Sequence, residues 1–265
     1  MKGLGVLALA VGLAASAQPT AAQEIPVDLE LVLAVDVSGS VDEREYSLQM
    51  IGISEALRLP EVGELIASHH DGVALTLVHW SAAHVNRQVV PWRLLRNGAD
   101  ASAFADEVDK SHRSNWANQT AIGHAIQFCV KLLETNAYAG SLRRIDMSGD
   151  GRNNSGIAPA TARETALARH ITVNGLPILD GDYGLGDYYS AFVAGGDDAF
   201  VITAETYKDF AKAFRTKLIR ELSPKLALNA RPVLGSVLPS LMAGPRAGHP
   251  DDMADKTGWP GQARP

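Results

Sequence analysis

Five oxygen-bearing side chains in three separate segments could share one hard cation: Asp36, Ser38, Ser40, Thr120 and Asp150. The first three lie in the segment DVSGS, directly after an apolar, strand-like run. The fourth precedes a strongly periodic helical segment, and the fifth follows another short strand. Carboxylate and hydroxyl oxygens suit Mg²⁺ or Mn²⁺ rather than zinc. The spacing therefore predicts a divalent-cation site, although DVSGS alone could equally be a turn that caps a helix.

Strand-like and helical segments alternate along the chain. Apolar strand-like runs cover residues 28–36, 72–80, 144–148, 171–179 and 200–203, and residues 84–95 have the alternation of an edge strand. Helical patterns lie between them, at 46–57, 100–108, 122–133, 159–169, 188–193 and 210–222. Parallel strands need crossover connections, which helices supply. The pattern predicts an α/β fold, a doubly wound, mostly parallel sheet with one antiparallel edge strand and helices on both faces.

In such an open sheet, ligands bind at the carboxyl ends of the strands. The candidate cation ligands stand at strand ends or helix starts, as a shared site requires. Two helix starts are also expected from capping residues. Ser40 and Glu43 fit a capping box, and Asp100 could cap the helix at 100–108.

The chain divides into three parts by composition. Residues 1–22 have the basic start, short apolar run and small residues of an export signal. The mature chain should then begin between Gln18 and Glu24, in the periplasm or outside the cell. Residues 27–222 form the expected domain, and 223–265 form a flexible tail rich in Pro, Gly and Ala. No later segment is apolar enough for a membrane anchor, and the lone Cys129 is expected to be a buried core residue.

The composition limits the class of partner. The chain has 265 residues, a net charge of −6, 46% hydrophobic residues and 20% charged residues, as in an ordinary globular protein. It lacks the clustered Lys and Arg with which proteins neutralise nucleic-acid phosphates. Nucleic acid is therefore not an expected partner.

The five candidate ligands, taken in their order along the chain, resemble a motif of the von Willebrand factor A domain family. That family's metal-ion-dependent adhesion site (MIDAS) uses Asp-x-Ser-x-Ser, a Thr before a helix and an Asp after the fourth strand. All five positions match here. The stretch 144–154, RIDMSGDGRNN, further resembles an uncharacterised bacterial, exported branch of the family, a domain of unknown function. The resemblance covers about residues 27–222.

The resemblance implies a binding module rather than an enzyme. The two Ser and the Thr would bind the cation directly, the two Asp often through water, and an Asp or Glu of a protein partner would complete the coordination. Two departures stand out. Gly149 replaces a frequent Thr, where it could ease the exit of the strand, and Asp146 lies inside a strand that should be buried and needs partners there.

Other functions are less favoured by the sequence. A haloacid-dehalogenase-like phosphatase with Asp36 as nucleophile would want a second carboxylate where Ser38 stands. A purely structural domain with a vestigial metal site is the third possibility. The histidines show no zinc-ligand spacing. The loop 180–187 suggests calcium but lacks the spaced acidic ligand of an EF-hand.

Overall fold

The computed structural model describes residues 24–113 and 117–223. The expected export signal at 1–22 lies outside the described residues, as does the expected tail beyond Ser223. Within the described ranges, no helix is both long and apolar enough to cross a membrane.

The described residues contain a five-stranded sheet in the order β3-β2-β1-β4-β5. Strand β1 pairs in parallel with β2 and β4, β4 pairs in parallel with β5, and only the β2–β3 pair is antiparallel. The strand bounds are β1 Ile25–Asp36, β2 Val73–Trp80, β3 Asn86–Leu95, β4 Tyr138–Gly149 and β5 Ile171–Pro177. The predicted doubly wound, mostly parallel sheet with an antiparallel edge strand is confirmed.

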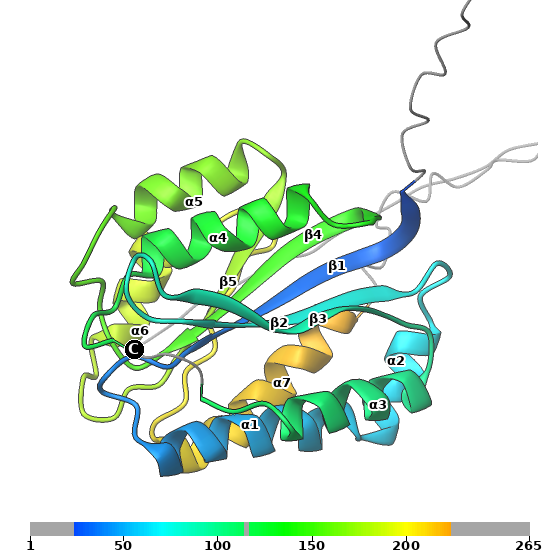
Figure 1. Cartoon of the computed structure of the whole chain (residues 1–265), viewed down its shortest axis with the longest axis horizontal. Helices are drawn as coiled ribbons and strands as arrows, with labels where there is room; N and C mark the ends of the chain where they lie inside the picture. Colours follow the sequence, from blue (N-terminus) through cyan, green and yellow to red (C-terminus); the bar gives the residue numbers. More distant parts are fainter. Residues whose placement is uncertain (1–23, 114–116, 224–265) are drawn as a thin grey trace, which may run out of the picture. The chain divides into compact units, whose positions relative to one another are not determined.

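Helices cover both faces of this sheet (Figure 1). Helices α4 and α5 lie on one face, and α1, α2, α3 and α7 lie on the other. Helix α2, with a proline at its first turn, was not expected from the sequence. The helix bounds are α1 Glu43–Leu57, α2 Pro60–Ala67, α3 Gly98–Asp109, α4 Ile122–Glu134, α5 Pro159–Leu167, α6 Leu185–Tyr188, the π-helical turn Tyr189–Val193, the 3₁₀ turn Tyr207–Asp209 and α7 Phe210–Leu222.

Strand β1 is the centre of the core because both of its faces are covered. Its alternate residues belong to different apolar clusters. Leu31, Leu33 and Val35 pack with α1, α3 and α7, whereas Val32 and Ala34 pack with α4 and α5. A strand buried on both faces needs the near-continuous apolar sequence seen here. Cys129 of α4 is also buried, as expected.

The register of the strands brings their carboxyl ends to one edge of the sheet. Asp36, the last residue of β1, is paired with Trp80, the last residue of β2. On the other side, Val35 is paired with Ser148, and Gly149 with Pro177. The residues that follow β1, β2, β4 and β5 therefore emerge side by side.

Besides the unexpected α2 and the start of β4 at Tyr138 rather than at residue 144, three details differ from the expectations. Asp42, not Ser40, caps α1, and it forms the capping box with Glu45. Asn97, not Asp100, caps α3. The expected strand at 200–203 is reduced to isolated bridges, such as the parallel one between Gly175 and Val201, so it forms no regular strand.

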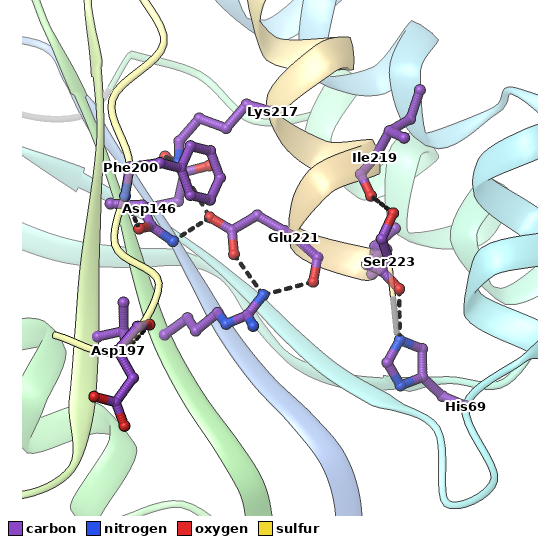
Figure 2. Close-up of polar contacts among 12 residues, drawn as sticks. His69, Asp146, Asp197, Phe200, Lys217, Ile219, Glu221 and Ser223 are labelled. Atoms are coloured by element: carbon purple, nitrogen blue, oxygen red, sulfur yellow. Dashed lines mark hydrogen bonds and ion pairs between the residues drawn. The ribbon is translucent and has the colours of Figure 1, made fainter. Parts of the chain in front are cut away.

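The carboxylate of Asp146 is paired with a lysine of α7. The distance from Lys217 Nζ to Asp146 Oδ1 is 3.1 Å, and the same ammonium lies 3.1 Å from Glu221 Oε1. Glu221 also accepts hydrogen bonds from Arg144 at 3.0 Å and from Asn174 at 2.6 Å. Figure 2 shows Lys217 and Glu221 reaching from α7 toward Asp146 on the sheet. Two acidic and two basic side chains thus balance one another in a buried layer.

Burial and the neighbouring Glu221 raise the pKa of Asp146 to about 7, while the Lys217 ammonium opposes that rise. Removing the ammonium would leave two buried carboxylates poorly compensated, which is far costlier than losing a surface charge. This buried group of charges fixes where α7 sits on the sheet.

We expect Lys217→Met to lower the free energy of unfolding by about 3 kcal/mol or more. Lys212→Met, an exposed lysine of the same helix, should change it by less than about 0.5 kcal/mol. Urea denaturation followed by circular dichroism measures both variants. In the double variant Asp146→Asn/Lys217→Met, part of the loss should be recovered because fewer uncompensated charges remain. Equal, small effects of Lys217→Met and Lys212→Met would contradict this account.

Candidate functional site

The five expected ligand residues lie at the carboxyl edge of the sheet. Asp36 ends β1, and Ser38 and Ser40 follow it in the turn before α1. Asp150 directly follows β4, and Thr120 stands two residues before α4. Asp36, Ser38 and Thr120 are buried, Asp150 is half-buried and Ser40 is exposed. The site therefore has a buried floor and one open side.

Hydrogen bonds link four of these residues in a continuous series. Asp36 Oδ1 accepts a hydrogen bond of 2.7 Å from the Ser38 amide. The hydroxyls of Ser38 and Ser40 are 3.2 Å apart, and the Ser40 hydroxyl donates to Asp150 Oδ1 at 2.8 Å. Residues that are 110 positions apart in the chain are thus in direct contact.

Thr120 is held beside the same group by its backbone. Its amide donates to Asn154 Oδ1 at 2.8 Å, and its carbonyl accepts from the Asn154 amide at 3.0 Å. A Cβ added to Gly151 would lie 3.6 Å from the Thr120 hydroxyl oxygen, so that hydroxyl lies next to the residue that follows Asp150. The structure therefore gathers all five side chains at one place.

The turn that carries the two serines is supported from the segments beside it. Arg113 donates to the Ser38 carbonyl at 2.8 Å, and the Gly39 amide donates to the Ala117 carbonyl at 3.1 Å. A Cβ at Gly39 would lie 2.3 Å from Asn118 Oδ1. Glycine is needed here for close approach to Asn118, rather than for an unusual backbone angle.

The buried carboxylate of Asp36 lies near a second carboxylate. Burial raises the pKa of Asp36 most, and the negative charge of Asp150 raises it further, to about 8. Hydrogen bonds from Ser38 oppose that rise. Within the described ranges, neither carboxylate forms an ion pair with a cationic side chain. Among the described residues, ion pairing therefore does not offset the cost of ionising both carboxylates.

The surroundings of Gly149 explain why a larger residue is absent there. A Cβ at this position would lie 2.8 Å from Asp36 Oδ2, 2.8 Å from the Tyr189 hydroxyl and 3.1 Å from Trp80 Cζ2. A threonine Cβ would therefore approach three side chains too closely. Close packing at the site accounts for the glycine, and its role in the exit of the strand stays a prediction.

Tyr207 is a site residue that the sequence analysis missed. Its hydroxyl donates to Asp150 Oδ2 at 2.9 Å, so both oxygens of that carboxylate accept a hydrogen bond. Burial and the charges of Asp150 and Asp36 raise the pKa of Tyr207 strongly, which keeps its proton in place as a donor. Tyr207 is the first residue of the 3₁₀ turn that leads into α7. Its position 57 residues beyond Asp150 gives no local signal of this contact.

A cleft of about 300 Å³ adjoins the site. Tyr207 lines it together with acidic, basic and apolar side chains, namely Asp42, Arg44, Glu45, Leu48, Asp180, Thr206 and Lys208. None of the five candidate ligands lines this cleft, which is joined to the site through Tyr207 and its hydrogen bond to Asp150.

The donor set suits a hard divalent cation. Two carboxylates and three hydroxyls supply only oxygen, and unneutralised negative charge at the site favours a cation. Among the described residues, no group of three or more His, Cys, Asp and Glu side chains could hold a metal ion, so a cation here would rely on the hydroxyls as well. In the loop 180–187, for which calcium was considered, Asp182 forms an ion pair with Arg152 at 2.8 Å. This ion pair lowers the pKa of the Asp182 carboxyl group.

Residues 26–226 match the family described as "Protein of unknown function (DUF1194)". The comparison with curated proteins finds no match. Among solved structures, proximal thread matrix protein 1 from the mussel byssus is similar, with a TM-score of 0.56 and 17% identity over 75% of this chain and 49% of that one. A form of the same mussel protein with a zinc-occupied MIDAS motif gives 0.53 and 15%, over 75% and 48%. This chain therefore spans about half the length of the mussel protein.

Two proteins of bacterial pili have the same fold. The pilus adhesin SpaC of Lactobacillus rhamnosus GG, in its open conformation, has a TM-score of 0.53 and 14% identity, over 74% of this chain and 30% of that one. The vWF domain of the type V pili tip protein Mfa5 of Porphyromonas gingivalis has 0.52 and 10%, over 72% and 94%. At these identities the likeness establishes the fold alone. The chain belongs to the family described as "Protein of unknown function (DUF1194)", and its domain has the von Willebrand factor A fold.

Proposed function

We propose that this protein is an exported binding module that uses one Mg²⁺ or Mn²⁺ ion to capture an acidic side chain of a protein partner. Asp36, Ser38, Ser40, Thr120 and Asp150 would hold the cation. The observation that carries the proposal is the gathering of these five side chains around two carboxylates that no basic side chain of the described residues neutralises.

The chemistry of the donors supports capture of a carboxylate. Hydroxyls are weak, neutral ligands, so a cation bound mainly by them keeps much of its positive charge. Mg²⁺ prefers six oxygen ligands and usually keeps some water molecules, which a carboxylate can replace. The exposed Ser40 leaves an approach for that carboxylate from outside.

Two solved structures with the same fold support a role in cation-dependent binding. One has a zinc-occupied MIDAS motif, and another is a pilus adhesin. We assign Mg²⁺ or Mn²⁺ here because all five donors are hard oxygens. The sequence of residues 1–22 and the pilus proteins among the relatives support export to the periplasm or beyond.

A non-enzymatic role agrees best with the burial of Asp36. A phosphatase nucleophile must reach its substrate, whereas the side chain of Asp36 is fully buried and Oδ1 already accepts the Ser38 amide. A structural domain with a vestigial site would need no open side. Cation binding and partner capture, tested as follows, separate these possibilities.

We expect one Mn²⁺ ion to bind per chain, and both Asp36→Ala and Asp150→Ala to abolish binding because each removes a charged ligand. Isothermal titration calorimetry measures this. Asp182→Ala, which removes a neighbouring carboxylate that pairs with Arg152, is the matched control and should bind normally. Circular dichroism verifies that each variant is folded. Absence of binding in the unaltered protein, or unchanged binding in both site variants, would contradict the cation site.

Cation affinity should rise as the pH rises toward about 8 and level off above that value. The pKa of Asp36 is raised from 3.8 to about 8 in the folded, cation-free protein, so a proton must leave before the carboxylate can bind. Below about pH 8 the affinity should change by up to about tenfold per pH unit.

The same shift has a defined sign for stability. Because the pKa of Asp36 is higher in the folded than in the unfolded state, its contribution to stability is present below about pH 4 and is lost as the pH rises through about 8. Saturating Mn²⁺ should therefore raise the melting temperature more at pH 8.5 than at pH 6. Calorimetry at pH 7 in buffers of different ionisation enthalpy should show proton release. An affinity that is constant between pH 6 and pH 9 would contradict this assignment.

Partner capture should require both the cation and Thr120. Immobilised protein in Mg²⁺ should retain a partner from a cell-envelope extract, and EDTA or Thr120→Ala should abolish retention because each removes part of the cation's coordination. Thr161→Ala, an exposed threonine of α5, is the matched control. If a partner is retained equally well in EDTA and by Thr120→Ala, it binds through another surface of the fold.

A further inference from the structure

Three side chains meet at Gly149 behind the candidate cation site. They come from β1, β2 and the π-helical turn Tyr189–Val193, which are distant in sequence. A single point, the ideal Cβ position of that glycine, lies 2.8 Å from both Asp36 Oδ2 and the Tyr189 hydroxyl oxygen. The two oxygens are therefore no more than roughly twice 2.8 Å apart. Trp80 Cζ2 lies 3.1 Å from the same point, and this atom adjoins the ring carbon that carries the indole nitrogen.

Each of these side chains has a polar atom without a hydrogen-bond partner among the described residues. The atoms are Asp36 Oδ2, the Tyr189 hydroxyl and Trp80 Nε1. All three side chains have a relative exposure of 0%. A buried polar group without a partner is costly, so such atoms in a native protein need an explanation.

The three groups are chemically complementary. A carboxylate oxygen accepts, an indole N–H only donates, and a phenol hydroxyl can do both. Burial and the charges of Asp36 and Asp150 raise the pKa of Tyr189 well above its usual value, so this hydroxyl keeps its proton. A buried water molecule typically makes about three hydrogen bonds to polar groups of this kind.

We propose that one buried water molecule joins Asp36 Oδ2 to the Tyr189 hydroxyl and Trp80 Nε1, and that Tyr189 and Trp80 are thereby positioning residues for Asp36. The water-mediated contact fixes the orientation of the carboxylate from behind, while Ser38 holds its other oxygen. The consequence for cation binding rests on the function proposed above, whereas the buried contact itself does not.

The backbone around Tyr189 favours this role. A π-helical turn begins at Tyr189, directly after α6, and its carbonyl accepts a hydrogen bond of 2.8 Å from the Ala194 amide. Turns of this kind change the direction of side chains within a helix and occur frequently at functional sites. The neighbouring Tyr188 is engaged elsewhere, because its hydroxyl accepts from the Asn153 amide at 3.2 Å.

A double-mutant cycle on the cation-free protein tests the buried contact. Tyr189→Phe keeps the ring that fills the core and removes only the hydroxyl, and Asp36→Ala removes the acceptor. Their effects on the free energy of unfolding should be non-additive, since each removes an end of the same contact. Tyr188→Phe, combined with Asp36→Ala in the same way, is the matched control and should be additive. Additive effects for Tyr189→Phe would overturn the proposal.

Calorimetry with Mn²⁺ tests the positioning role. Tyr189→Phe should weaken Mn²⁺ binding about tenfold, as loss of a group that orients a metal ligand commonly does. Trp80→Phe should also weaken it, whereas Tyr188→Phe should not. Equal affinity in Tyr189→Phe and the unaltered protein would overturn the positioning role. Absence of Mn²⁺ binding in the unaltered protein would instead refute the proposed function, and the metal-free cycle alone would then decide whether the buried contact exists.

Discussion

Two carboxylates close together at the end of the sheet, with no basic side chain of the described residues to neutralise them, are the constraint on which the site depends. Asp36 is fully buried, and the charge of Asp150 adds to the cost of ionising it. The chain meets this cost in part with hydrogen bonds, from Ser38 to one carboxylate and from Ser40 and Tyr207 to the other. Hydrogen bonds alone do not remove this cost, because the pKa of Asp36 stays raised to about 8. A divalent cation would offset it and convert a locally unfavourable arrangement into a binding site.

Helix α7 connects this edge of the sheet with a second group of buried charges. At its start, the 3₁₀ turn places the Tyr207 hydroxyl on Asp150. Further along, Lys217 and Glu221 are engaged by Asp146 and Arg144 of β4. A displacement of the helix along the sheet would separate these pairs inside a poorly hydrated layer, which is costly. Opposite charges thus give the helix one preferred position, which apolar packing by itself would define less sharply.

The two regions of the molecule use buried charge in opposite ways. Around Glu221 the acidic and basic side chains balance, so this region needs nothing from outside to be stable. Around Asp36 and Asp150 no basic side chain of the described residues forms an ion pair, and Tyr207, which donates to Asp150, also lines a cleft. Uncompensated charge next to an opening is what distinguishes a site for a charged ligand from a structural ion pair.

The sequence by itself determined the fold class, the carboxyl ends of β1 and β2 and the five candidate ligands, whereas the bounds of β4 and β5 differ and no regular strand forms at 200–203. Hydrophobic periodicity is a local property, and a turn after a strand has the same composition whatever lies opposite it. Contacts between distant segments were decided only in the tertiary structure. The sequence predicted Ser40 with Glu43 as the capping pair of this helix, but Asp42 caps it together with Glu45, and the Ser40 hydroxyl contacts Asp150.

The same reason explains the roles of Tyr207, Gly149 and Asp146. Tyr207 lies 57 residues from its partner, and the side chains that crowd Gly149 come from three separate elements. Asp146 could be recognised in the sequence as a buried carboxylate that needs partners, but the packing of α7 on the sheet supplied Lys217. Side-chain partners across such separations depend on how helices dock on the sheet, and no local pattern encodes that geometry.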